Sequence, residues 1–179
     1  EELTAKLEDA QKKIVQLEQQ IASSGMTPNT PAASVTETGD VVLQFQKPVY
    51  EAGTKLIALT FDDGPGKYTE RLLDELKARG LHATFFVVGQ NAQHYPALLK
   101  RMAEEGHVIG NHTMNHKNLT KLSESEVLQQ IDACADIVEN ASGVRPYLLR
   151  CPGGNVNYAV KKVLKDQHLA LVNWSRSEE

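Results

Sequence analysis

The chain has 179 residues, of which 41% are hydrophobic and 23% charged, and this fits one globular domain with an appended segment better than two full domains. Nineteen Lys and Arg residues against 23 Asp and Glu residues give a net charge of −4, which argues against a nucleic-acid-binding protein, because such surfaces concentrate positive charge. No stretch reaches the ~18 consecutive apolar residues of a membrane span, and two cysteines do not form a disulfide framework.

The first 40 residues differ from the rest in composition. Residues 22–40 are small and polar and include two prolines, which predicts a flexible linker. Residues 1–21 are predicted to be helical, because their apolar side chains recur at alternating spacings of four and three. Such a helix either forms a short coiled coil, through which the chain would self-associate, or stays a solvated amphipathic helix. The apolar positions are Leu3, Leu7, Ala10, Ile14, Leu17 and Ile21.

From residue 41 onward, short apolar runs alternate with helical periodicity, and the 16 acidic and 16 basic residues balance. A capping box formed by Ser123 and Glu126 predicts the start of a long helix with Val127, Ile131, Cys134 and Val138 on its core side. Repeated strand–helix units imply an α/β fold with a parallel sheet, either open or closed into a barrel. The other predicted elements are strands at residues 56–61, 83–88, 108–110, 147–149 and 169–174, and helices at residues 69–79, 96–105 and 158–165.

Two aspartates, Asp62 and Asp63, follow the first predicted strand, at the strand end where α/β proteins gather their chemistry. Adjacent carboxylates repel each other, so a cation is the partner that would stabilise them, with one aspartate as its ligand and the other as a general base. The same Asp-Asp-Gly-Pro string also fits a simple turn in which aspartate caps backbone amides.

Two histidines, His112 and His116, follow the third predicted strand. On one helical turn, imidazoles four residues apart point the same way and can share a divalent metal. Two unrelated surface histidines would give the same pattern. The other four histidines occur singly and are interpreted as structural or solvent-facing.

Arg150 ends a later predicted strand and precedes the string Cys-Pro-Gly-Gly. A strand-end arginine can fix a carboxylate, and glycines expose backbone amides to a developing oxyanion. A tight turn with a solvated arginine is the alternative. Polar side chains of these types at the ends of successive strands together predict a metal-dependent hydrolase.

The same residues form motifs that resemble those of the polysaccharide deacetylases with a NodB-homology domain. The string at residues 60–65, TFDDGP, is similar to the first motif of that family, and residues 112–116, HTMNH, resemble the second. Residues 150–154, RCPGG, resemble an R-x-P-G-G variant of the third. The resemblance covers roughly residues 54–175 and implies an irregular (β/α) barrel.

Carried over to this sequence, the resemblance implies a metal site formed by Asp63, His112 and His116, usually for zinc, with cobalt or another divalent ion also compatible. It implies that Asp62 is the general base and that Arg150 orients it. The backbone amide of Gly153 would face the oxyanion.

The implied activity is removal of N-acetyl groups from an N-acetylglucosamine polymer, with peptidoglycan as the expected substrate and a chitin-like polymer as an alternative. The predicted stalk and linker suit an extracellular bacterial enzyme tethered to the membrane by a segment upstream of this sequence. On this interpretation residues 41–179 are the catalytic domain.

The sequence departs from the family pattern at its C-terminal end. Ser177 stands where the fourth family motif has an aspartate, and no L-x-H string of the fifth motif occurs. We therefore expect an incomplete barrel and a C-terminally truncated catalytic domain. The competing hypothesis is a catalytically impaired glycan-binding or scaffold module with an oligomerising stalk.

Overall fold

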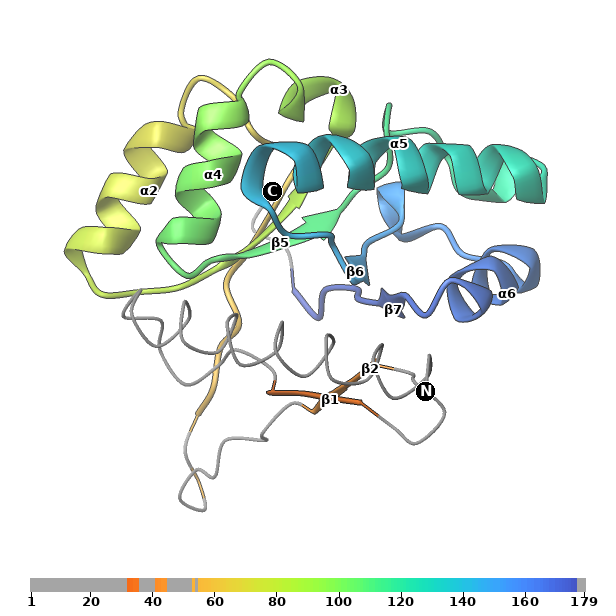
Figure 1. The fold of residues 1–179 in the computed structure, drawn as a ribbon, viewed down its shortest axis with the longest axis horizontal. Coiled ribbons are helices and arrows are strands. Elements are labelled where there is room, and N and C mark those ends of the chain that lie inside the picture. Colours follow the sequence, from red (N-terminus) through yellow and green to blue (C-terminus); the bar gives the residue numbers. More distant parts are fainter. Residues whose placement is uncertain (1–31, 36–40, 45–52, 54, 177–179) are drawn as a thin grey trace, which may run out of the picture. The chain divides into compact units, whose positions relative to one another are not determined.

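The computed structural model describes residues 32–35, 41–44, 53 and 55–176 (Figure 1). The chain divides into two compact units, residues 1–56 and residues 57–179. The helix predicted for residues 1–21 lies outside the described residues, so the coiled coil and self-association through it stay predictions. No helix in the described ranges is both long enough and apolar enough to cross a membrane.

The described part of the first unit includes a two-stranded antiparallel ladder. Strand β1 (Ala32–Val35) pairs with β2 (Val41–Gln44), with Ala32 opposite Gln44 and Val35 opposite Val41. Strand β1 falls within residues 22–40, for which a flexible linker is predicted, so these four residues form a paired strand instead. Composition did not reveal the strand because its backbone hydrogen bonds go to a partner segment outside the predicted linker.

The second unit contains a five-stranded parallel sheet with its strands in chain order, β3-β4-β5-β6-β7. An open doubly wound sheet reverses direction at a switch point, whereas a (β/α) barrel adds each strand beside the preceding one. The order therefore confirms the barrel-type winding, and the described strands form part of such a barrel, with β3 and β7 at its two edges. The strands are β3 (Thr60–Asp62), β4 (Thr84–Val87), β5 (Val108–Asn111), β6 (Leu148–Leu149) and β7 (Ala170–Leu171).

Each connection between successive strands carries helical structure, and α2, α4 and α5 lie over one face of the sheet (Figure 1). The capping box that starts α5 is confirmed: Ser123 N–H donates to Glu126 Oε2 at 2.8 Å, and Glu126 N–H donates to Ser123 Oγ at 3.4 Å. The helical elements are α2 (Thr69–Ala78), α3 (Gly89–Ala92), α4 (Pro96–Glu104), η1 (Leu119–Lys121), α5 (Glu124–Ser142), η2 (Pro152–Gly154) and α6 (Tyr158–Asp166). Of these, α3 and the two 3₁₀ turns η1 and η2 are not predicted by periodicity because each is a single turn.

The hydrophobic core lies between the sheet and its helices. Burial of each large apolar side chain there stabilises the fold by about 1.5–3 kcal/mol. One cluster joins β4 and β5 to α2, α4 and α5, and it includes Leu73, Phe85, Val87, Leu99, Met102, Ile109 and Val138. A second joins α5, β6 and α6, and it includes Val127, Ile131, Leu149, Cys151, Val160 and Leu164.

Side chains alternate across β4, and this alternation places one aromatic ring beneath the site. Phe85 and Val87 belong to the helix-side core, whereas Phe86 is fully buried and its ring faces Gly110 and Arg150. A Cβ at Gly110 would lie 2.5 Å from that ring, so glycine is needed on β5 for Phe86 to fit.

The first predicted strand is shorter and less buried than predicted. Strand β3 covers only Thr60–Asp62, and the side chains before it are exposed: Leu56 by 59%, Ile57 by 86% and Leu59 by 40%. An apolar run shows that these side chains could be buried. They are exposed because β3 is an edge of the described sheet and pairs with a strand on one side only.

Candidate active site at the carboxyl ends of the strands

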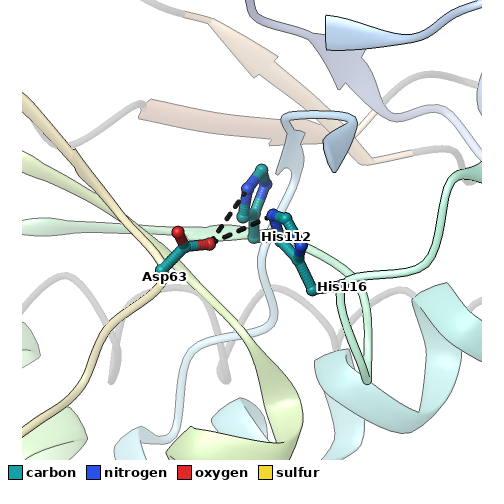
Figure 2. A group of neighbouring side chains, drawn as sticks. All are labelled: Asp63, His112 and His116. Carbon is teal, nitrogen blue, oxygen red and sulfur yellow. Dashed lines mark ion pairs between the residues drawn. The ribbon is translucent and has the colours of Figure 1, made fainter. Parts of the chain in front are cut away.

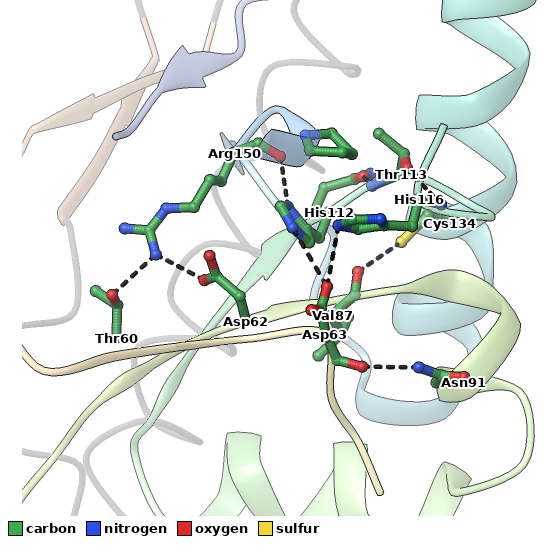
Figure 3. Close-up of polar contacts among 12 residues, drawn as sticks. Thr60, Asp62, Asp63, Val87, Asn91, His112, Thr113, His116, Cys134 and Arg150 are labelled. Atoms are coloured by element: carbon green, nitrogen blue, oxygen red, sulfur yellow. Dashed lines mark hydrogen bonds and ion pairs between the residues drawn. The ribbon is translucent and has the colours of Figure 1, made fainter. Parts of the chain in front are cut away.

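The two aspartates that follow β3 point toward different partners (Figure 3). Asp62 is the last residue of β3, and its Oδ1 accepts a hydrogen bond from Arg150. Asp63 has a left-handed backbone conformation, φ 65°, which directs its carboxylate toward His112 and His116. The turn after β3 therefore separates the two carboxylates, so that Asp62 faces Arg150 and Asp63 faces the two histidines.

Both histidines lie in the loop that follows β5 (Figure 2). The predicted helical turn is wrong: Thr113 and His116 have left-handed conformations, with φ values of 69° and 57°, and residues 112–116 form no helix. The loop is closed instead by His116 N–H, which donates to Thr113 Oγ1 at 3.0 Å. The two rings still converge, with centroids 5.0 Å apart.

The geometry of Asp63, His112 and His116 suits a divalent metal. Asp63 Oδ1 lies 3.5 Å from His112 Nε2 and 3.2 Å from His116 Nε2, and the three ligand atoms all lie within 4.8 Å of one another. Two ligands bound about 2.1 Å from a tetrahedral zinc ion are separated by about 3.4 Å. The donor set therefore fits, and the structure brings together the three residues predicted as ligands.

A backbone carbonyl fixes the tautomer of His112. Its Nδ1 lies 2.6 Å from the carbonyl oxygen of Arg150, which can only accept, so Nδ1 carries the proton and the lone pair of Nε2 faces Asp63. Burial is the main cause that lowers the pKa of His112. The neutral ring, which is the form that binds metal, is favoured as a result.

Arg150 is buried and connects the later strands to β3. Its Nη1 donates to Asp62 Oδ1 at 2.6 Å and to Thr60 Oγ1 at 2.9 Å, and its Nε donates to Val172 O at 3.3 Å. The guanidinium carbon lies 4.0 Å from the centre of the Phe86 ring. A solvated arginine is therefore excluded, and this side chain fixes the orientation of the Asp62 carboxylate.

The glycines after Arg150 are required by backbone geometry. Gly153 has φ 61°, and a Cβ there would lie 2.7 Å from Asn155 Nδ2. Gly154 has φ 66°, and a Cβ there would lie 3.2 Å from the ring of Trp174. The role of the Gly153 amide toward an oxyanion stays a prediction.

The remaining cysteines and histidines have structural or surface positions. Cys134 and Cys151 are free and buried, and burial raises the pKa of Cys134 to about 12 and that of Cys151 to about 11. Neither thiol is therefore a reactive thiolate at neutral pH. His107 is buried and accepts a hydrogen bond from the Ala83 amide at Nδ1, whereas the other three histidines outside the site, His82, His94 and His168, are exposed.

Sequence reasoning gave no role to three residues that hold the site together. Thr60 accepts a hydrogen bond from Arg150, and Asn91 Nδ2 donates to the Asp63 carbonyl at 2.7 Å. Asn111 accepts from Thr113 N–H and donates to Ile131 O. Asn111 is detectable as a polar residue at the end of a buried strand, but no local pattern distinguishes Asn91 from a surface asparagine.

Comparison with known proteins identifies one family. A family model described as polysaccharide deacetylase matches residues 50–172. A peptidoglycan-N-acetylglucosamine deacetylase of Bacillus cereus is 43% identical over 120 residues, which are 66% of this chain and 44% of that protein. The peptidoglycan-N-acetylmuramic acid deacetylase PdaC of Bacillus subtilis is 49% identical over 112 residues, 62% of this chain and 24% of that protein.

A solved structure of a T48 deacetylase with substrate has a TM-score of 0.67 and 45% sequence identity, covering 72% of this chain and 63% of that one. The chain spans less than half the length of these two curated relatives.

Proposed function

The chain belongs to the polysaccharide deacetylase family, and from that premise we propose that it is the catalytic part of a metal-dependent N-deacetylase. Its proposed reaction removes acetyl groups from N-acetylglucosamine residues of a polysaccharide, with peptidoglycan as the substrate. One observation carries the proposal: the Asp63–His112–His116 cluster and the Asp62–Arg150 ion pair meet at the carboxyl ends of β3, β5 and β6.

We assign Asp63, His112 and His116 as the ligands of a divalent metal, with zinc as the leading candidate and cobalt as an alternative. When bound, such an ion polarises an acetamide carbonyl and lowers the pKa of a water molecule. His112 presents Nε2 because its Nδ1 donates to a carbonyl. Asp63 supplies Oδ1 from a backbone conformation that its neighbours hold.

We assign Asp62 as the general base that takes the proton from the attacking water. It is adjacent in sequence to the ligand Asp63, and its side chain is 30% exposed, so water can reach it. Arg150 holds Oδ1 at 2.6 Å and thereby fixes the direction of the carboxylate. We further propose that the Gly153 amide donates to the oxyanion that forms on the acetamide oxygen.

The substrate proposal is supported by the names of the relatives, both of which act on peptidoglycan. They differ in the sugar, N-acetylglucosamine in one and N-acetylmuramic acid in the other, and we propose N-acetylglucosamine. Peptidoglycan lies outside the cytoplasmic membrane, so we propose that this domain acts at the cell surface.

Acetate release tests the function and separates the two sugars. Chitohexaose contains only N-acetylglucosamine, whereas peptidoglycan contains both sugars, and mass spectrometry of digested peptidoglycan locates each deacetylated residue. We expect acetate from both substrates and product masses that assign the loss to glucosamine. Loss of acetate only from muramic acid would overturn the choice of sugar.

A second candidate function is a glycan-binding module that does not turn over. Serine at position 177, where the fourth family motif has an aspartate, favours it. Binding of chitohexaose without release of acetate, in protein that holds one metal ion per chain, would support this candidate and contradict the first.

A further inference from the structure

A short turn at the end of β4 contacts both loops that carry the metal-ligand side chains. The turn comprises residues 88–91: Val88 is the N-cap of α3, and the other three are the first three residues of that helix. On one side it holds the aspartate loop: Val88 N–H donates to Gly64 O at 3.0 Å, and Asn91 Nδ2 donates to Asp63 O at 2.7 Å. The second of these bonds reaches the backbone of the ligand residue itself (Figure 3).

On its other side the same turn holds the histidine loop. Gly89 N–H donates to Thr113 O at 3.0 Å, and Gln90 N–H donates to Met114 O at 2.7 Å. Both acceptors lie between His112 and His116 in the sequence. Four consecutive residues therefore donate four hydrogen bonds, two to each loop.

The turn has little room to shift. Gly89 is buried, and a Cβ at this position would lie 2.7 Å from Met114 Sδ and 3.1 Å from Cys134 Cα. The Gly89 backbone therefore packs directly against α5, and this close contact fixes the position of the turn. A turn that is fixed in this way can determine the positions of both loops that it contacts.

Asp63 depends on such support. A non-glycine residue with φ 65° is uncommon and persists where its surroundings hold it. The Asn91 bond to the Asp63 carbonyl is the contact from the turn that acts directly on this residue.

We infer that the 88–91 turn sets the separation between Asp63 and the two histidines, and that Asn91 is a positioning residue for Asp63. The inference rests on the proposed metal site and deepens it. Asn91 acts through the Asp63 backbone and is assigned no contact with the substrate or the metal.

The test compares Asn91→Ala with a matched control, Asn157→Ala. Asn157 Oδ1 accepts a hydrogen bond from Val160 N–H at 2.9 Å at the start of α6, outside the proposed site. Asn91→Ala loses one asparagine hydrogen bond to the backbone. Asn157→Ala loses two, because Asn157 Nδ2 also donates to Thr120 O at 3.5 Å. The measurements are zinc affinity by chelator competition, the visible spectrum of the cobalt-substituted protein, and thermal unfolding of the metal-free protein.

For Asn91→Ala we expect zinc affinity to fall by about 10- to 100-fold, the usual effect of losing a residue that orients a ligand. We also expect an altered cobalt spectrum. The melting temperature of the metal-free protein should change little, because alanine is a better helix former than asparagine. Asn157→Ala should show the reverse, a lower melting temperature and unchanged zinc affinity.

An Asn91→Ala variant with wild-type zinc affinity and cobalt spectrum would overturn the positioning role while leaving the metal site intact. So would a loss of affinity that Asn157→Ala matches, because it would reflect general destabilisation. If the wild-type chain bound no stoichiometric metal, the proposed function would fail, and the inference would fail with it.

Discussion

Replacing Arg150 by methionine tests how strongly the later strands are tied to β3. Arg150 makes an ion-paired hydrogen bond to Asp62, donates to two neutral acceptors, Thr60 Oγ1 and the Val172 carbonyl, and makes a cation–π contact with Phe86. Methionine has a similar length and keeps an apolar contact with the ring, but it cannot donate a hydrogen bond. The substitution therefore removes the polar contacts with little change in volume.

The expected loss of stability follows from these contacts. Removing one partner of a buried ion pair costs about 3–5 kcal/mol. Arg150 is almost fully buried, with 3% of its side chain exposed, but the Asp62 side chain is 30% exposed. Water can solvate part of the carboxylate that is left unpaired, which places the cost near the lower end. We expect the free energy of unfolding to fall by about 3 kcal/mol.

Urea denaturation of the metal-free protein measures this loss without a contribution from bound metal. Arg150→Lys is the matched variant: it keeps a positive charge for Asp62 but cannot bridge Thr60 and Val172 as a planar fork. We expect Arg150→Lys to lower the free energy of unfolding by about half as much as Arg150→Met does. A loss below about 1 kcal/mol for Arg150→Met, or equal losses for the two variants, would refute a structural ion pair.

Three further predictions concern the ligands, the base and the pH dependence. Asp62→Asn should keep stoichiometric zinc but lose about 100- to 10,000-fold in rate of acetate release; a near-normal rate would make Asp62 structural. The double variant His112→Ala/His116→Ala should lose most bound zinc by elemental analysis, and retention of one zinc per chain would contradict the site. Burial lowers the pKa of His107, so the unfolded chain binds its proton more readily than the folded protein. The free energy of unfolding should therefore fall as the pH drops below about 6.5, by at most about 1.4 kcal/mol per pH unit for this group. His107→Gln should remove that share of the slope, leaving the share of His112, whose pKa is also lowered; an unchanged slope in urea titrations would contradict the assignment.

The sequence by itself determined the features that depend on neighbouring residues. The capping box at Ser123 and Glu126 is confirmed because both partners lie within one turn. The core face of α5 is confirmed because side chains at helical spacing share one side. The alternation of strands and helices could be predicted because the spacing of apolar residues within each element is a local property of the sequence. This alternation implied a parallel sheet with the polar residues at its strand ends.

Tertiary structure alone decided which of these residues meet and at what distance. Arg150 and Thr60 are 90 positions apart in the sequence and are joined by a hydrogen bond, and no periodicity reports a pairing of that range. Asp63 Oδ1 lies 3.2 Å from His116 Nε2 because both residues have left-handed backbone conformations. Helical spacing in the sequence does not predict such conformations. The role of the turn at residues 88–91 could not be predicted, because the four hydrogen bonds that it donates to the two loops join residues distant in the sequence. The motif residues are thus local in sequence, whereas their geometry depends on strand order and on backbone contacts between distant loops.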